Sequence, residues 1–287
     1  MPYFRILLFP LALGLILLVS GASAWQTMQP AAIPAPAPPA PAPPTEPDSV
    51  ASEILERALG AIDPSRVRWL EMKLWQQVEV QGLAYEATGR YLIAPDHRFR
   101  LEVSMRQGAA TGELLSVSDG HTLWQTKRVG DGAWLLSKKL CLTSILETLS
   151  QPEVKPEVRR EFIQSQSMAG VAPLLQDLRQ HLTWTRWERV RRQDREFIKL
   201  TGVGTLHEAA QFPWPEGAPR QCRVYLDAQS LWPHRIEWWG PDAPRVGDVL
   251  LFQTEYREPV LNQPLSEEQA RREFSIDESK LTTKPEG

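Results

Sequence analysis

The stretch RFRLEVSMR (residues 98–106) alternates apolar and polar side chains with a period of two. Phe99, Leu101, Val103 and Met105 fall on one face of an extended chain, and the residues between them, four of which are charged, fall on the other. Such alternation is typical of a strand that has one face in the core and one in solvent. These nine residues therefore predict an antiparallel sheet with one apolar face.

The segments on the amino-terminal side continue this period of two. The apolar residues that share a parity there are Leu70, Met72, Leu74, Val78 and Val80 in one segment and Tyr85, Ala87, Tyr91 and Ile93, with Gly89, in the next. Turn-forming residues separate the segments at 81–82, 94–96, 107–108 and 119–120. Because such turns join neighbouring strands through tight hairpins, we expect a meander.

A helix is predicted before these strands, and a group of helices is predicted between them and a second group of strands. Residues 50–62 carry apolar side chains at helical spacing, and Asp63-Pro64 ends the pattern. Further helices are expected at 140–149, 156–166, 171–182 and 266–271, and further strands at 183–191, 195–203, 220–226, 233–239 and 246–257. The fold class predicted for residues 49–287 is mainly β (α+β). Its architecture is a half-closed, curved antiparallel β-barrel whose helices cover the concave face.

The amino-terminal 48 residues differ in composition from the rest. Arg5, an apolar run from Ile6 to Val19 and the small residues Ala22 and Ala24 form the three parts of a secretory signal peptide over residues 1–24. An uncleaved anchor in the inner membrane, a tether through residues 6–25, is the alternative, because that length spans a bilayer. Residues 25–48 are rich in proline and alanine, which predicts a disordered linker.

The net charge and the motifs of the sequence reduce the number of function classes to consider. Thirty-two Lys and Arg against thirty-five Asp and Glu give a formal charge of -3, so we expect no nucleic-acid partner. The five histidines stand apart in the sequence, and neither a phosphate-binding loop nor a nucleophile elbow is present. We therefore predict a non-catalytic protein with no cofactor, no metal and no catalytic residue.

Two local features concern side-chain placement. Cys141 and Cys222 are the only cysteines, and two alternatives are open: one disulfide, as exported proteins often have, or two separate thiols. Trp238 and Trp239 are adjacent in an expected strand, so one side chain is predicted on each face of the sheet.

Several short motifs follow one another along the chain. GRYLIAP (89–95) precedes HRFRLE (97–102), VSDGHTLW covers 117–124, and VYLD (224–227) precedes LWPHRI (231–236). In order and spacing they resemble the LolA/LolB-like superfamily of bacterial envelope proteins, whose archetype is the periplasmic lipoprotein carrier. The proline-rich spacer and the Trp-rich strands look more like a planctomycete-type branch of that superfamily than like the lipoprotein carrier itself.

The resemblance implies a half-closed antiparallel barrel that holds acyl chains on its concave face. We accordingly expect an exported protein of the periplasm or cell envelope that binds a lipid or lipoprotein acyl chain in an apolar cleft. The side chains expected to line this cleft are Met72, Leu74, Val78, Phe99, Leu101, Val103, Met105 and Ile236. The alternative is an envelope sensor or structural interaction module of the same fold, whose charged face (Arg98, Arg100, Glu102, Arg106) contacts an envelope protein.

Overall fold

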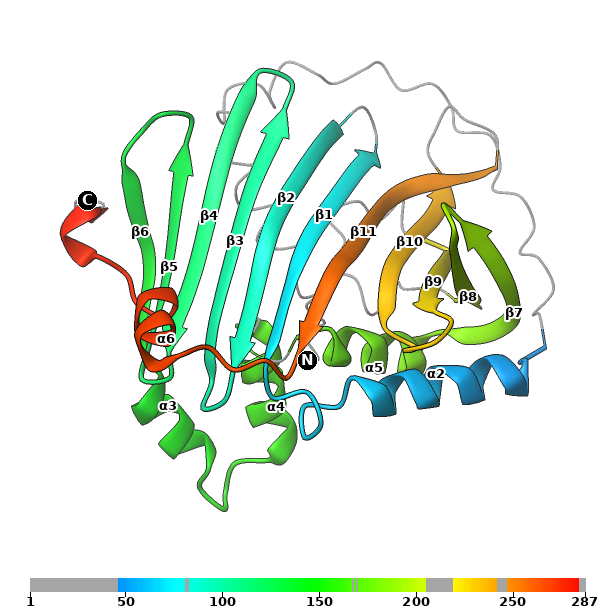
Figure 1. Ribbon diagram of the computed structural model, residues 1–287, viewed down its shortest axis with the longest axis horizontal. Helices are drawn as coiled ribbons and strands as arrows, with labels where there is room; N and C mark the ends of the chain where they lie inside the picture. Colours follow the sequence, from blue (N-terminus) through cyan, green and yellow to red (C-terminus); the bar gives the residue numbers. More distant parts are fainter. Residues whose placement is uncertain are drawn as a thin grey trace.

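The computed structural model describes residues 46–80, 83–166, 168, 170–204, 219–241 and 247–283, and in these residues twelve strands form one curved sheet (Figure 1). The first half of the sheet comprises β1 (Leu70–Val80), β2 (Leu83–Ala94), β3 (Arg98–Gln107), β4 (Ala110–Asp119), β5 (Thr122–Val129) and β6 (Trp134–Cys141). The second half comprises β7 (Thr183–Arg192), β8 (Arg195–Val203), β9 (Gln221–Asp227), β10 (Pro233–Pro241) and β11 (Asp248–Leu261), and β12 (Leu281–Thr283) lies at one edge. The open, curved, antiparallel architecture predicted from the sequence is confirmed.

The sheet consists of two meanders joined side by side. The order is β12-β6-β5-β4-β3-β2-β1-β11-β10-β9-β8-β7, so the first strand pairs with the last long strand of the chain. In this β1–β11 pair, Leu74 lies opposite Tyr256 and Val78 opposite Phe252. The short strand β12 pairs with β6 in parallel, which is an exception to the antiparallel prediction.

The alternation in residues 98–106 places its apolar side chains on the buried side of the strand, as expected. Phe99 and Leu101 are fully buried, and their partners across β2 are Ile93 and Tyr91. We call the side of the sheet that carries these residues the inner face, and the opposite side the outer face. Gly89 lies on the inner face where β2 approaches β3, and a Cβ there would clash with the main-chain carbonyl oxygen of Glu102.

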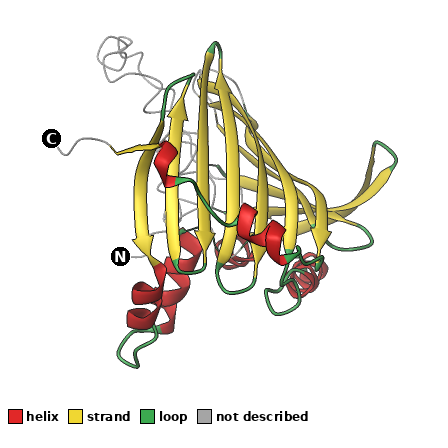
Figure 2. Ribbon diagram, turned by 60° about the vertical axis from the view of Figure 1, so that its left-hand side comes forward, coloured by secondary structure: helices red, strands yellow, loops and turns green. Residues whose placement is uncertain are grey.

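Helices α2 (Ser49–Ala61), α3 (Leu142–Leu149), α4 (Pro156–Ser165) and α5 (Ala172–His181) gather toward one end of the strands (Figures 1 and 2). Asp48 caps α2, its carboxylate accepting hydrogen bonds from the Val50 and Ala51 amides at 2.9 and 3.1 Å. Leu55 of α2 and Leu175 of α5 are fully buried in the main core that includes Phe99. These four helices thus belong to the inner face, although α3 begins two residues later than expected because β6 extends to Cys141.

The carboxy-terminal segment crosses the outer face. It contains α6 (Glu267–Glu273), which begins at a capping box of Ser266 and Gln269, the 3₁₀-helix η2 (Glu278–Lys280) and β12. Ala270 and Phe274 pack on Leu92 and Ala94 of β2 and form a second, smaller core. The outer face is therefore covered in part by the chain's own end (Figure 2).

Residues 1–24, predicted to be a signal peptide or anchor, and most of the predicted linker at 25–48 lie outside the described residues. None of the helices in the described ranges combines the length and the hydropathy needed to cross a bilayer.

Candidate functional site

The predicted cleft residues all lie on the inner face. Seven of the eight are buried and Val103 is half-buried; the seven are Met72, Leu74, Val78, Phe99, Leu101, Met105 and Ile236. Met72, Leu101 and Ile236 come from three different strands and belong to one continuous core. The sheet thus brings together side chains that are up to 164 positions apart in the sequence. That they contact a ligand stays a prediction.

A row of residues across the inner face changes from apolar to polar. Met72 lies opposite Tyr91, Tyr91 opposite Leu101, and Leu101 opposite Ser116 on β4. The row continues through Gln125 of β5 to Lys138 of β6. Along this row the inner face is therefore amphiphilic, with apolar side chains at β1 to β3 and polar ones at β4 to β6, whereas the adjacent row keeps Leu123 and Leu140 in the apolar core.

Two members of the polar end are notable for their surroundings. Ser116 is fully buried, and among the described residues its hydroxyl has no hydrogen-bond partner. The Lys138 ammonium group donates a hydrogen bond of 2.8 Å to the Oε1 atom of Gln166, which is buried just after α4. Because a buried polar atom without a partner costs about 1–3 kcal/mol, the Ser116 hydroxyl marks a place where a polar ligand atom would be stabilised.

The apolar part of the inner face is electrically neutral. Tyr91 and Tyr256 are buried there, and burial raises the pKa of both phenols well above the usual tyrosine range. The Tyr91 hydroxyl oxygen accepts a hydrogen bond from the Gly170 amide at 3.2 Å. Tyr91 lies between Met72 and Leu101, and Tyr256 lies opposite Leu74. These uncharged phenols suit a hydrocarbon ligand, because no charge has to be desolvated.

Ser116 and Lys138 are not among the residues predicted from the sequence, because the cleft residues were predicted from apolar alternation. Polar residues at inner positions of β4 to β6 do not produce that pattern. The available signal was the register: once Leu101 is placed on the inner face, the Ser116 position follows from a tight β3–β4 hairpin.

The adjacent tryptophans lie on opposite faces, as predicted. Trp238 is buried on the inner face and stacks on Phe252 with ring centroids 5.2 Å apart. Trp239 is half-buried on the outer face, where its indole N–H donates a 3.0 Å hydrogen bond to Glu237.

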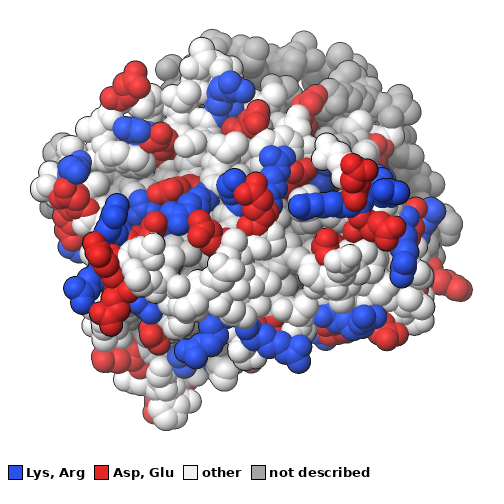
Figure 3. All heavy atoms as spheres, viewed as in Figure 1, with Lys and Arg blue, Asp and Glu red and all other residues white. Residues whose placement is uncertain are grey.

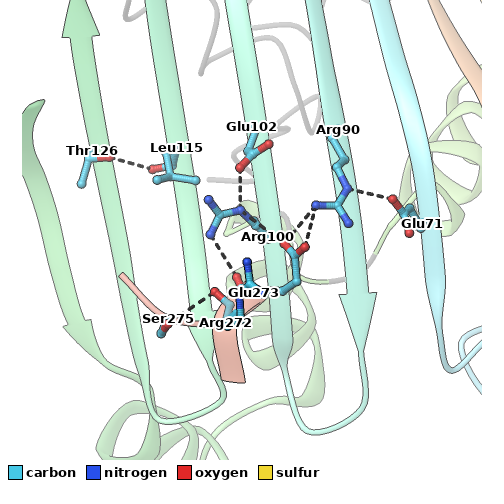
Figure 4. A network of polar contacts seen from close by, with 9 residues as sticks. All are labelled: Glu71, Arg90, Arg100, Glu102, Leu115, Thr126, Arg272, Glu273 and Ser275. Carbon is cyan, nitrogen blue, oxygen red and sulfur yellow. Dashed lines mark hydrogen bonds and ion pairs between the residues drawn. The ribbon is translucent and has the colours of Figure 1, made fainter. Parts of the chain in front are cut away.

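Two of the four charged residues that the alternative hypothesis assigns to a protein partner, Arg98 and Arg100, contact the chain's own carboxy-terminal segment. Arg100 donates to the Glu102 carboxylate at 2.6 Å and to the main-chain oxygen of Glu273 at 3.0 Å, and Arg90 binds Glu273 and Glu71 (Figure 4). These ion pairs belong to a band of mixed charge across the outer face (Figure 3).

Arg98 and Arg106, which the same hypothesis assigns to a protein partner, differ in their surroundings. The Arg98 guanidinium lies over the rings of Trp69 and Phe274, at 5.7 and 5.6 Å. Arg106 is mostly exposed, with Glu86 at 3.6 Å. Of the four, Arg106 is therefore the one whose surroundings leave it most accessible to another molecule.

Both cysteines are free thiols, so the disulfide alternative is wrong. Cys141 is exposed at the end of β6, whereas Cys222 is buried on β9 near the other end of the sheet, and the strand order keeps them apart. Within the described ranges, no group of three or more His, Cys, Asp or Glu side chains is placed to hold a metal ion. His207 lies outside those ranges.

The chain is similar to several proteins of solved structure. No protein-family model and no curated protein sequence matches the chain. The similar structures include LprF from Mycobacterium bovis, with 11% identity and a TM-score of 0.46 over 77% of this chain and 97% of that one. They include the lipoprotein LppX from Mycobacterium tuberculosis, with 12% identity and a TM-score of 0.41 over 76% and 98% of the two chains.

A LolA superfamily protein from Nitrosomonas europaea is also similar, with 12% identity and a TM-score of 0.29 over 79% of this chain and 97% of that one. The likeness concerns the fold.

Proposed function

We propose that the protein is a non-catalytic component of the cell envelope that binds the acyl chain of a lipid or lipoprotein on the inner face of its sheet. The observation that carries this proposal is the amphiphilic row from Met72 to Lys138, because its gradient from hydrocarbon to polar groups matches that of an acyl-chain amphiphile.

The apolar end of the row provides the binding energy. Each buried methylene contributes about 0.8 kcal/mol, so an alkyl chain against a few inner-face side chains gains several kcal/mol. Met72 and Met105 support this role, because the flexible thioether side chain adapts to ligands of irregular shape. Val78 and Met105 lie toward the ends of β1 and β3, away from the end where the helices gather (Figure 1).

The polar end of the row orients the ligand. A carboxylate or ester oxygen near Ser116 would accept the hydrogen bond that the buried hydroxyl lacks among the described residues. The Lys138 ammonium group on β6, two strands away from Ser116, would favour an anionic head group. We therefore infer that the alkyl chain lies over β1 to β3 and the head group over β4 to β6.

The proposed location is outside the cytoplasm. Residues 1–24 have the composition of an export signal, and the proline-rich residues 25–48 separate that segment from the folded part. Whether residues 6–25 are cleaved or form a membrane tether is decided by sequencing the amino terminus of the protein from its native host.

Uptake of fatty acid by the delipidated full chain tests the proposal, with native mass spectrometry as the measurement. Val103→Glu places a carboxylate on the half-buried part of the inner face and should weaken retention at least about tenfold. Ser104→Glu is the matched control, because the neighbouring residue is exposed on the outer face of the same strand. Retention by Ser104→Glu should equal that of the wild type.

Head-group orientation has its own test. Lys138→Gln should weaken binding of a fatty acid and leave binding of the fatty alcohol of equal chain length unchanged. If folded wild-type protein takes up neither ligand, acyl-chain binding is wrong and the interaction-module hypothesis takes its place.

A further inference from the structure

A hollow of about 840 Å³ lies on the outer face, at the far end of the sheet from the carboxy-terminal segment. Its lining residues come from the β7–β8 hairpin, β9, β10 and β11: Arg192, Gln193, Arg195, Phe197, Tyr225, His234, Arg235, Glu255, Arg257 and Glu258. Arg235 alternates with the inner-face residue Ile236, so the hollow and the proposed acyl-chain site are on opposite sides of the sheet.

Positive charge dominates this lining. Four guanidinium groups face two carboxylates, which gives a formal surplus of two positive charges. Of the two carboxylates, Glu258 lies 2.6 Å from Lys73, a residue outside the hollow, and Glu255 is bound by Arg235 and Arg257. The net field in the hollow therefore favours an anion.

Aromatic rings and carboxylates hold three of the arginines in place. The Arg192 guanidinium lies 4.6 Å from the centre of the Tyr225 ring, and its Nη2 atom donates a 3.1 Å hydrogen bond to the hydroxyl group of the same tyrosine. Arg235 lies 5.7 Å from the same ring and 2.6 Å from the buried Glu237. Arg257 lies 5.1 Å from the Trp75 ring. Because these side chains are already ordered, a ligand does not have to immobilise them.

Donor groups remain in the hollow after these contacts are made. The Arg195 side chain is exposed, and its charge is attracted to the Asp227 carboxylate at the edge of the hollow. The Nε atom of Arg235 is buried and has no partner in the same set of residues. An arginine carries five N–H donors in a planar fork that matches two oxygens of a tetrahedral anion.

We propose that this hollow, which we name the arginine hollow, binds a phosphate group. A phosphate fits better than a single carboxylate, because its charge of up to two matches the surplus and its oxygens accept from several guanidinium groups at once. The group belongs either to a small phosphorylated molecule or to a phospholipid head group. This inference does not rest on acyl-chain binding, since the residues involved are on the other face.

A neighbouring hollow shows the selectivity of the charge pattern. It shares Arg195, Phe197 and His234 with the arginine hollow, but its carboxylates (Asp194, Glu196, Asp227) outnumber its arginines (Arg191, Arg195). An anion that reaches this end of the sheet is therefore directed to the arginine hollow.

Binding experiments with the full chain test the proposal in two arms. One arm titrates inorganic phosphate by calorimetry, and the other measures sedimentation with phosphatidylcholine vesicles prepared with and without phosphatidylglycerol. Arg195→Glu should weaken the interaction at least about tenfold, the loss expected when a hydrogen bond to a charged group is removed. Arg189→Glu is the control, since Arg189 is exposed on β7, lies outside the lining and causes the same change in net charge.

Each outcome decides the proposal. Phosphate binding that depends on Arg195 but not on Arg189 supports a free phosphorylated ligand. Binding confined to vesicles with phosphatidylglycerol, with the same dependence on the two variants, supports a lipid head group. Absence of binding in both arms, or equal effects of the two variants, overturns the proposal.

Discussion

The two faces of strand β3 are held by different kinds of contact. On the inner face Phe99 and Leu101 are fully buried in the main core. On the outer face Arg100 forms an ion pair with Glu102 and a hydrogen bond to the backbone of Glu273 in α6. Burial of apolar area stabilises in proportion to the area, whereas partly exposed ion pairs contribute about 0–1 kcal/mol each. The inner face therefore carries the stability of the fold.

Contacts on the outer face fix the positions of charged side chains and add little to the free energy of unfolding. Cross-strand charges repeat along it, from Arg128 with Glu113 on β4 and β5 to Arg235 with Glu255 on β10 and β11. Cations also lie over aromatic rings, as Arg223 does over Trp239 at 3.9 Å. Such contacts fix guanidinium groups at defined places and keep them accessible, which is the property that the arginine hollow requires.

The largest effect should come from Phe99→Ala on the inner face. Removing a fully buried ring from the main core costs about 3–5 kcal/mol through lost burial and a residual cavity. Arg106→Ala is the control on the outer face of the same strand, and its cost should stay below about 0.5 kcal/mol because the side chain is exposed. Urea unfolding measures both, and similar costs for the two variants would contradict the assignment of the faces.

High pH should also weaken the inner face. Burial raises the folded-state pKa of Tyr91 and Tyr256 above the ordinary value of 10.0, so the folded protein holds these protons more tightly than the unfolded chain does. Their contribution is complete below pH 10 and declines as the pH rises above it, by roughly 3 kcal/mol for the pair at about pH 11.

Urea unfolding at a series of alkaline pH values measures this decline. Tyr91→Phe should flatten the dependence on pH, because one of the phenols whose pKa is raised by burial is gone. A wild type and a variant whose stabilities fall in parallel would refute the assignment of the decline to Tyr91.

The two faces also differ in how far the sequence predicts them. Alternation in residues 98–106 predicted the strand, its inner face and its hairpin neighbours, because burial of one face imposes the period of two. It did not predict the pairing of β1 with β11, since the contact joins segments that are far apart in the sequence. It also missed β12, whose three residues are too short to show a period.

The candidate sites follow the same rule. The eight side chains predicted to line a cleft are apolar and periodic, so the sequence placed all of them on one face. The arginine hollow combines side chains from the β7–β8 hairpin, β9, β10 and β11, and no local spacing relates Arg195 to Arg257. Charged outer residues show no period of their own, because solvent accepts them at any exposed position.

An intermediate effect is expected where the outer face has its own small core. Phe274→Ala removes a buried ring from the cluster with Leu92, Ala94 and Ala270. The cost should be about 2 kcal/mol, below that of Phe99→Ala, because few groups are buried there. It should also be local, so hydrogen exchange in residues 266–283 should accelerate while the amides of β1 to β3 keep their protection. Equal acceleration in β1 to β3 would show that the outer cluster is part of the main core.

The smallest effect should come from the ion pairs of α6. Glu273 binds Arg90 at 2.9 Å, but its side chain is 28% exposed, and Arg90 and Arg100 keep Glu71 and Glu102 as partners when Glu273 is lost. Glu273→Gln should therefore cost about 1 kcal/mol at low salt, with a smaller cost at high salt because solvent ions screen the pair.

The exposed pair of Lys73 and Glu258 offers the matched comparison, since both side chains are 64% exposed. Lys73→Met should change the free energy of unfolding by less than about 0.5 kcal/mol at either salt concentration. If Glu273→Gln behaves in the same way, the Glu273 carboxylate does not help to hold α6 on the outer face. A measurable, salt-dependent difference between the two variants would instead show that the charge band helps to fix α6 on the outer face.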